Sequence, residues 1–424
     1  MWQDGSGTLS TSRTVVVAGG GPSGLMAAGT AALLGATTIL LEKMDRPGRK
    51  LDLTGKGRCN LTNHAPLEQF LDAYGPCGRF LRQAMMRFSN TDLVAFVENL
   101  GVAIELERSG RFFPAGDRAT DITAALVEWV REARVDIRPH SPVNKLIIED
   151  RRIVGVQTGS KKMISADAVV LATGGLSYPE TGSSGDGFAL SQAVGHSIVP
   201  PRPALVPVET KGDIAPRLQG LSLRDVGVRL IINEQREAEM VGDVLFTHFG
   251  LSGPVVLHFS RSIAGSLQAG CRVEVALDLL PALDERALEK RLVTSLNEQG
   301  ARQLHNILEG LLPDPLVSVI LDVLNLSGEM LGSQVTTAER RRLRQCLKDF
   351  RLVVSGHRSW DEAIVTAGGV SLAEVDPRTM QSRLVKGLYF AGEVLDIDGP
   401  TGGYNLQAAF STGRLAGQSA ASGD

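Results

Sequence analysis

Residues 15–18 are four small apolar residues in a row, followed by glycines and then by a long apolar run, 25–34. The first run predicts a strand buried on both faces, as in a parallel sheet, because no polar position interrupts it. The second run is rich in alanine and predicts a helix that ends at Gly35, a residue typical of helix C-termini. Residues 37–41 are again apolar and predict another buried strand. The order strand, helix, strand indicates a parallel α/β domain.

The next 130 or so residues alternate between helical and strand-like patterns. Three segments have the apolar spacing of helices: 78–88, 90–100 and 121–133. Residues 143–148 and 153–158 flank a charged turn and predict a β-hairpin. The uninterrupted apolar run 168–171 predicts a second strand of the parallel type.

Three prolines, Pro200, Pro201 and Pro203, predict a domain boundary, because proline interrupts regular structure. Beyond them the pattern becomes β-like, and helical patterns follow. The strand-like segments are 204–209, 221–232 and 271–279, and the helical ones include 284–296 and 302–312.

From about residue 352 small residues and glycines become frequent again, as in the first domain. The pattern there predicts a strand over 388–392 and a helix over 401–417. We therefore predict a nucleotide-binding domain made of two separate segments, residues 1–200 and 352–424. Residues 201–351 are predicted to form an inserted substrate or cap domain.

Composition narrows the class of protein. A chain of 424 residues exceeds the usual size of one domain, and 21% charged residues fit a soluble globular protein. The net charge of −3 gives no overall attraction to nucleic acid or to anionic membranes. The four cysteines are too widely spaced for a redox pair or a zinc cluster, and the polar N-terminus lacks a signal sequence. We expect a cytoplasmic protein with a small-molecule substrate, no nucleic-acid or membrane partner and no metal; the oligomeric state stays open.

The glycines after the first strand carry the first chemical signal. Gly19, Gly21 and Gly24 form a G-x-G-x-x-G pattern between a predicted strand and a predicted helix. Such glycines allow a tight turn, close approach of a pyrophosphate and close packing of helix on strand. Glu42 ends the second strand 18 residues after Gly24, near the spacing expected for a carboxylate that binds a ribose. Pro22 and Ser23 occupy the variable positions, and proline suits the first helical turn. This combination predicts a dinucleotide site.

A glycine-rich, basic segment over 43–63 follows the second strand. Its glycines allow close backbone approach, and its cations suit a pyrophosphate. A mobile surface loop is the alternative interpretation, and we favour contact with the phosphates or the cofactor ring. The predicted ligands are Lys43, Arg49, Lys50, Thr54, Gly55, Gly57, Arg58, Cys59 and Asn60.

Two further strand ends carry glycines and polar residues. The strand over 168–171 ends in Ala172, Thr173 and Gly174, where the backbone turns against a ligand, and 181–187 opens another helix N-terminus. A strand that delivers an acid and then a Gly-Gly turn into a helix suits a flavin, because helix N–H groups stabilise negative charge on the reduced ring. The predicted ligands there are Gly392, Glu393, Asp398, Gly402, Gly403, Tyr404, Asn405, Leu406 and Gln407.

Taken together, these motifs resemble a bacterial two-domain flavoprotein family described as aminoacetone-oxidase-like, or as NAD(P)/FAD-dependent oxidoreductases with an inserted domain. The resemblance covers the chain from Thr14 to about Gly417. Besides the motifs above, it rests on the segments 178–179, 246–254 and 367–370.

The resemblance implies bound FAD, with Glu42 on the adenosine ribose and the backbone of Val143 on the adenine. It implies an α/β, Rossmann-like FAD-binding domain of the glutathione-reductase type, interrupted by an inserted β-barrel and helical domain. The implied activity is hydride transfer at flavin N5, either in amine oxidation or in NAD(P)H-driven reduction of a C=C bond, on a small organic substrate. The resemblance does not choose between these two reactions.

Candidates for the reaction itself are weaker. His248 is the best acid–base candidate of the inserted domain, although a lone histidine beside aromatic residues is more often structural. Cys59 and Tyr178 are candidates near the cofactor, and a packed thiol is the favoured role of Cys59. A second nucleotide fingerprint is absent from the sequence, so NAD(P)H is expected only as a transient ligand. The alternative is a non-catalytic flavin-binding protein that acts as a redox sensor or binds a partner protein. A tRNA-modifying flavoenzyme is disfavoured by the acidic net charge and by the absence of an aromatic and basic surface pattern.

Overall fold

The computed structural model describes residues 12–107 and 110–423, and the chain divides into two compact units. The first unit contains the chain up to Arg202 and again from Ile364 onward, and the second contains Pro203–Ala363. Residues 352–363, which we expected in the first domain, thus lie in the second. The reason is that Phe350–His357 forms a strand that pairs with two strands of the second unit.

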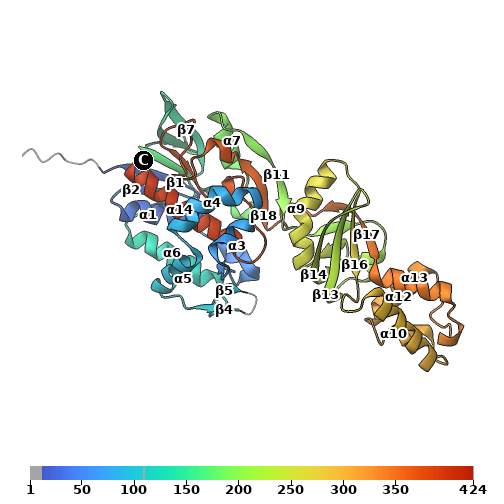
Figure 1. The fold of residues 1–424 in the computed structure, drawn as a ribbon. Helices are drawn as coiled ribbons and strands as arrows, with labels where there is room; N and C mark the ends of the chain where they lie inside the picture. Colours follow the sequence, from blue (N-terminus) through green and yellow to red (C-terminus); the bar gives the residue numbers. More distant parts are fainter. Residues whose placement is uncertain (1–11, 108–109, 424) are drawn as a thin grey trace, which may run out of the picture. The chain divides into compact units, whose positions relative to one another are not determined.

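A five-stranded parallel sheet forms the centre of the first unit (Figure 1). Its order is β19-β10-β1-β2-β6, with bounds Leu388–Phe390, Ala168–Leu171, Thr14–Ala18, Thr37–Leu41 and Asp136–Arg138. Residues 15–17 and 168–171 are fully buried, as their uninterrupted apolar runs predict. Strand β19 joins β10 after more than 200 intervening residues, so the two segments of the first unit complete one sheet.

Helices α1 (Pro22–Leu33) and α14 (Tyr404–Ser422) lie side by side against this sheet (Figure 1). Their backbones approach closely: a Cβ at Gly413 would lie 2.3 Å from the carbonyl oxygen of Ser23, and one at Gly417 would lie 2.4 Å from that of Ala27. Only glycine fits either position without a shift of the backbone. The same kind of contact joins α1 to α6 (Ala119–Glu132), where Gly29 lies under the ring of Trp129.

Smaller elements surround the central sheet. Three small sheets are present: β7-β8-β9 (Val143–Glu149, Arg152–Thr158, Met163–Ser165), β3-β5-β4 (Thr62–Asn63, Arg111–Pro114, Ile104–Leu106) and β11-β18 (Ile198–Ala204, Val365–Val370). The remaining α-helices of this unit are α2 (Arg49–Leu53), α3 (Leu67–Asp72), α4 (Gly78–Arg87), α5 (Asn90–Asn99) and α7 (Asp186–Ala193). The three prolines lie within β11, which crosses from the first unit into the second between Arg202 and Pro203; they are tolerated there because both strands of a two-stranded sheet are edge strands.

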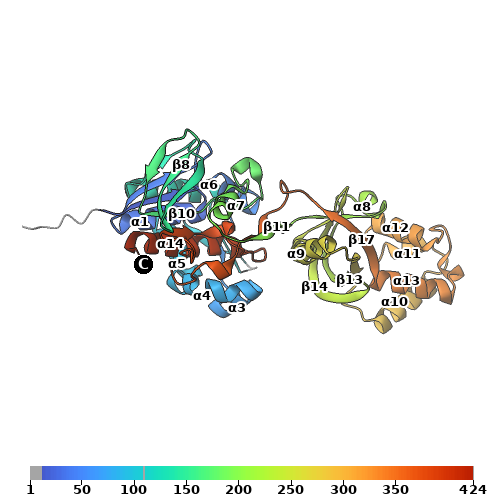
Figure 2. The same ribbon diagram turned by 90° about the horizontal axis from the view of Figure 1, so that it is seen from above.

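The second unit is a closed six-stranded barrel with helices, and it has its own core (Figure 2). The barrel order is β12-β15-β14-β13-β16-β17, with bounds Val208–Thr210, Gly250–Ser252, Gln235–Phe246, Ser222–Ile232, Val273–Asp278 and Phe350–His357. Its helices are α8 (Ile214–Arg217), α9 (Pro254–Gln268), α10 (Glu285–Glu298), α11 (Leu304–Leu308), α12 (Asp314–Leu324) and α13 (Thr337–Lys348). The predicted inserted barrel with helical parts is therefore present. Across the described residues, none of the helices has the length and apolar character needed to cross a membrane.

Candidate functional site

The three fingerprint glycines differ in what surrounds them. A Cβ at Gly24 would lie 1.8 Å from the carbonyl oxygen of Gly19, and one at Gly19 would lie 2.4 Å from that of Ala172. The packing of helix on strand therefore requires both glycines. A Cβ at Gly21 would meet no atom within 4 Å, and its φ of −75° suits any residue. Gly21 thus borders open space at the N-terminus of α1, where free N–H groups attract a phosphate.

Glu42 is held rigidly beside this turn at the end of β2. It is buried, with Oε2 accepting the N–H of Gly20 at 2.7 Å and Oε1 accepting the N–H of Met44 at 2.8 Å. Each carboxylate oxygen retains a further lone pair for a ligand hydroxyl. The carboxylate is therefore fixed in place beside the turn at Gly21.

Some predicted ligands carry a buried polar atom that has no hydrogen-bond partner among the described residues. Among these atoms are Oγ1 of Thr173, at the end of β10, and Oδ1 of Asn60, in the segment after β2. Buried polar atoms are normally bonded, so such atoms indicate a missing polar partner. Together with the open space at Gly21, they show that the residues present fit a dinucleotide cofactor.

The turn at Gly392 lies against the N-terminal part of α1, although 370 residues separate them in sequence. Gly392 has φ of 74°, and a Cβ there would lie 2.5 Å from Oγ of Ser23. Its N–H donates to Oγ1 of Thr412 on α14 at 3.0 Å. The two predicted ligand segments are thus brought together, as the sequence suggested.

Lys50 and Glu393 form a half-buried ion pair that the sequence did not predict as a pair. Nζ of Lys50 donates to Oε2 of Glu393 and to Oγ of Ser177, both at 2.6 Å. Oε1 of Glu393 accepts the Ser177 hydroxyl and the Thr366 N–H, both at 2.7 Å. Burial alone raises the pKa of Glu393, but the charge of Lys50 and these hydrogen bonds outweigh it and lower that pKa. The network connects α2, the segment after β10, β18 and the Gly392 turn.

Ser177 and Thr366 are the members of this network that sequence reasoning missed. Ser177 is fully buried two residues after the Gly174-Gly175 pair, so its place after a strand end was a usable signal. Thr366 lies within a buried apolar strand, where a threonine gives no particular signal.

The other predicted cations are paired with acids. Lys43 contacts Asp186 at 2.7 Å and also Ser184, and Arg49 contacts Asp45 at 2.8 Å. The hydrogen bond from Arg49 lowers the pKa of Asp45. A ligand phosphate would share Lys43 and Arg49 with these carboxylates.

Arg58 contacts two acids and an aromatic ring. It donates to Asp117 at 2.7 Å and to Glu107 at 2.6 Å, and its guanidinium lies 4.2 Å from the ring centre of Phe113. The bonds to Glu107 and Asp117 raise the pKa of Arg58. Its observed contacts are structural.

The segment expected to be an irregular loop contains α2 and a 3₁₀ turn, Thr54–Gly57. Gly55 and Gly57 have φ of 59° and 86°, and the Thr54 hydroxyl donates to the carbonyl oxygen of Leu51 at 2.7 Å. Cys59 is fully buried, and burial raises its pKa to about 12. A raised pKa keeps the thiol protonated, as in a packed cysteine rather than a reactive one.

The segment before α14 is fixed largely by its own side chains. Asn405 accepts the N–H of Gly399 at 2.8 Å and donates to the carbonyl oxygen of the same residue at 2.9 Å. Gly402 and Gly403 have φ of 116° and 95°, and a Cβ at Gly403 would lie 2.4 Å from the backbone of Thr62. Asn405 therefore shapes the turn, and the glycines let it pass β3.

Four other predicted ligands near α14 are packed into the protein. The amide of Gln407 is fully buried and bonded to Thr62, Ser411 and the carbonyl oxygen of Phe88, so its observed role is structural. The ring of Tyr404 lies 4.4 Å from that of Phe70, and burial raises the pKa of Tyr404. Leu406 packs against the core, and Asp398 is buried.

The remaining candidates lie on different elements. Tyr178 is partly buried directly after Ser177 and has a left-handed backbone with φ of 54°, a strained conformation that often marks functional sites. Val143 begins β7, paired with Thr158. His248 is exposed in the turn between β14 and β15 of the second unit, with its ring edge-on to Phe249.

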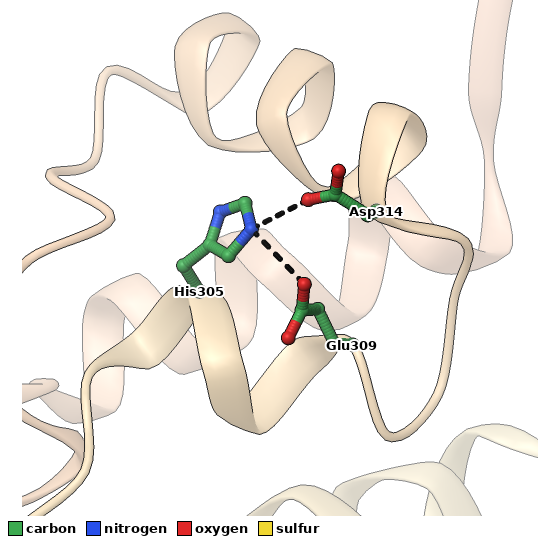
Figure 3. A group of neighbouring side chains, drawn as sticks. All are labelled: His305, Glu309 and Asp314. Carbon is green, nitrogen blue, oxygen red and sulfur yellow. Dashed lines mark hydrogen bonds and ion pairs between the residues drawn. The ribbon is translucent and has the colours of Figure 1, made fainter.

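A cluster in the second unit combines an imidazole with two carboxylates (Figure 3). Nε2 of His305 lies 2.7 Å from Oδ1 of Asp314 and 3.5 Å from Oε1 of Glu309. Both acids are exposed, and one ring nitrogen serves both, as in an ordinary surface ion pair. The sequence offered no metal-binding pattern here.

Residues 13–419 match the family described as the HI0933-like protein Rossmann domain. The chain belongs to the HI0933-like family. Its relatives include 3-dehydro-bile acid delta(4,6)-reductase of Clostridium scindens, 33% identical over 410 residues, which are 96% of this chain and 98% of that protein. Another is ribosomal RNA dihydrouridine synthase of Escherichia coli, 32% identical over 401 residues, 94% of this chain and 95% of that protein.

Solved structures agree on the fold of this HI0933-like chain. The 3-ketosteroid-delta4-(5alpha)-dehydrogenase of Rhodococcus jostii RHA1 matches with a TM-score of 0.52 at 17% identity, over 98% of this chain and 99% of that one. A flavocytochrome c3 fumarate reductase matches with the same TM-score at 20% identity, over 98% of this chain and 79% of that one. The predicted Rossmann-like FAD-binding fold and the flavoprotein oxidoreductase class are thereby confirmed. The expected name, aminoacetone-oxidase-like, is not carried by the relatives described above.

Proposed function

We propose that this HI0933-like protein binds FAD and reduces a carbon–carbon double bond conjugated to a carbonyl group. The observation that carries the proposal is the chemistry shared by two relatives that each match more than nine-tenths of the chain. One is named for reducing double bonds at positions 4 and 6 of a 3-oxo bile acid, and the other for making dihydrouridine, in which the double bond of uracil is saturated. In both substrates the reduced bond is conjugated to a carbonyl.

The cofactor would be held by the residues around the open space at Gly21. The N-terminus of α1 supplies N–H groups to the pyrophosphate, and Glu42 accepts the ribose hydroxyls. Thr173 and Asn60 each contribute a buried oxygen that has no hydrogen-bond partner among the described residues. The backbone of Val143 is the proposed contact for adenine. When bound and reduced, FAD would supply the hydride that the double bond accepts.

The chain's own residues then have two tasks. The ion pair of Lys50 and Glu393 fixes the Gly392 turn and α2, so it positions the backbone that surrounds the cofactor. A proton must reach the α-carbon of the substrate, and we assign it to the phenol of Tyr178, which follows this network directly and is partly buried. His248, in the second unit, is the alternative donor.

The test is anaerobic and uses the FAD-loaded protein. The bound flavin is reduced with NADPH, NADH or dithionite and then mixed with a 3-oxo-4,6-diene bile acid or with a uridine-containing ribosomal RNA fragment. We expect reoxidation of the flavin together with a product two mass units heavier than the substrate. Reoxidation by oxygen alone, with amines as the only reductants, would replace this proposal with an amine oxidase. A bound flavin that NADH, NADPH and a broad panel of amines all fail to reduce would favour the redox sensor.

The test includes an RNA fragment because the net charge of the chain and the names of its relatives disagree about a nucleic-acid substrate. The acidic net charge disfavours a nucleic-acid substrate, whereas two relatives of nearly full coverage carry the name ribosomal RNA dihydrouridine synthase. The bile-acid arm and the RNA arm share one reaction at the flavin and differ only in the substrate. The substrate that is converted to a product two mass units heavier gives the substrate class, and the proposed chemistry is the same in both cases.

A further inference from the structure

A groove on the β7-β8-β9 sheet of the first unit is separate from the cofactor cradle. It has a volume of about 640 Å³ and lies where β7 passes the end of α7 and the segment before β19. None of the predicted cofactor ligands lines it. The lining residues are 145–148, Arg151, 193–195 and 383–385. Figure 1 shows β7 and α7 at the same end of this unit.

The floor of the groove is apolar. Leu146 of β7 and Val385 are buried beneath it, each 4% exposed, while Val194 and Ile148 are partly covered. Leu384 adds a side chain that is 40% exposed. Volumes of 300 to 1,000 Å³ with apolar walls are typical of small-molecule sites.

The rim of the groove carries three cations and no acid. Lys145, Arg151 and Arg383 are all exposed, and none of them forms an ion pair with any residue that the structure describes. Other arginines of the first unit, such as Arg58 and Arg138, do contact carboxylates. Three unpaired cations around one groove produce a local positive potential in a protein of negative net charge.

The groove is also held rigidly from beneath. The ring of His196 is buried, with Nε2 2.8 Å from Oγ of Ser382 and Nδ1 3.0 Å from Glu374. The Ser382 oxygen accepts the N–H groups of Leu384 and Val385 at 3.0 and 2.9 Å. Glu374 is thus engaged below the groove, and the segment that carries Arg383 is fixed before any ligand arrives. A preorganised site loses less entropy on binding.

We propose that this groove binds a small amphipathic anion, with an apolar body on Leu146 and Val385 and a carboxylate or phosphate head among Lys145, Arg151 and Arg383. An RNA backbone would use the cations but would have no need of the apolar floor. The site shares no residue with the FAD cradle, so it does not depend on the proposed reaction.

The experiment is calorimetric titration of the FAD-loaded protein with octanoate and, separately, with 1-octanol. We expect saturable binding of octanoate and at least tenfold weaker binding of the neutral alcohol. The double variant Arg151→Gln/Arg383→Gln should weaken octanoate binding at least tenfold and leave octanol unchanged. Arg79→Gln is the matched control, since Arg79 is an exposed cation of the same unit without an ion pair and outside the groove.

Other outcomes overturn the proposal. Equal binding by wild type and the double variant would show that Arg151 and Arg383 take no part. Inorganic phosphate that binds as tightly as octyl phosphate would remove the role of the apolar floor. A single-stranded oligouridylate that binds in a way sensitive to the double variant, while octanoate does not, would assign the groove to nucleic acid instead.

Discussion

Replacing Gly21 by alanine should separate cofactor binding from folding. Of the three fingerprint glycines, only this one borders open space, so a methyl group there meets no protein atom within 4 Å. The added carbon would occupy the position from which a pyrophosphate reaches the N–H groups of α1. The polypeptide should therefore tolerate the change, and the cofactor should not.

The expected magnitudes follow from the geometry. For the cofactor-free protein, alanine reduces the entropy of the unfolded chain at a compatible φ but is a poorer N-cap than glycine, and each effect is below about 1 kcal/mol. We expect little net change in stability. For FAD, displacement of the pyrophosphate weakens one or two charge-assisted hydrogen bonds, worth about 1.5 to 3 kcal/mol each. This corresponds to a loss of affinity of roughly 10- to 100-fold or more.

The assay measures thermal unfolding of the cofactor-free protein and FAD affinity by fluorescence quenching, with Gly24→Ala as the matched variant. A Cβ at Gly24 would lie 1.8 Å from the Gly19 carbonyl oxygen, so this variant should lose stability even without FAD. Two results would refute the reasoning. One is Gly21→Ala binding FAD as tightly as wild type, and the other is Gly21→Ala unfolding as readily as Gly24→Ala.

Further predictions concern the cradle and the catalytic candidates. Lys50→Met leaves Glu393 without its cation and should lower the free energy of unfolding, measured by urea titration, by about 3 kcal/mol. The double variant Lys50→Met/Glu393→Gln should recover part of this loss. An unchanged free energy of unfolding in Lys50→Met would contradict a structural role for the ion pair. Because its pKa is lowered, the Glu393 carboxylate stabilises the folded protein fully above its ordinary pKa of 4.5, and this stabilisation is lost as the pH falls further. Glu393→Gln should therefore make the free energy of unfolding less dependent on pH in the acid range. Cys59, with a pKa of about 12, should resist thiol reagents at pH 8 until the protein is unfolded, and rapid labelling of native protein would contradict its burial. Tyr178→Phe should lower kcat by 10²- to 10⁴-fold while FAD stays bound and His248→Gln changes kcat less than fivefold; the reverse order would assign the proton to the histidine.

Sequence patterns predicted most of the first unit because its elements are local. The apolar runs 15–18 and 168–171 became central strands, and the glycines that punctuate them lie where the backbone turns. Pro200 and its neighbours lie in an edge strand that crosses from the first unit into the second, a position where a missing N–H is tolerated. The second boundary was misjudged, because alternation over 350–357 signals a barrel strand whose partners are distant in sequence.

The candidate site was predicted as a set of segments rather than as a set of contacts. The sequence indicated that Lys50 and Glu393 lie near the cofactor, but not that they bond to each other, since 343 residues separate them. Gln407 looked like a ligand from its place after a Gly-Gly turn, whereas the structure turns its amide toward Thr62 and Phe88. Side-chain direction depends on tertiary packing, which residue order alone does not specify.

The division of the central sheet has a consequence for synthesis on the ribosome. When Ala363 has been added, all the strands of the barrel exist, yet β10 still lacks its second neighbour, β19, and α1 lacks α14, the helix that packs against Ser23 and Ala27. The N-terminal segment must wait, with that surface uncovered, until the final 37 residues supply β19 and α14. Nascent chains stalled just before Leu388 should therefore contain a finished barrel beside an unfinished nucleotide domain, the state most in need of a chaperone.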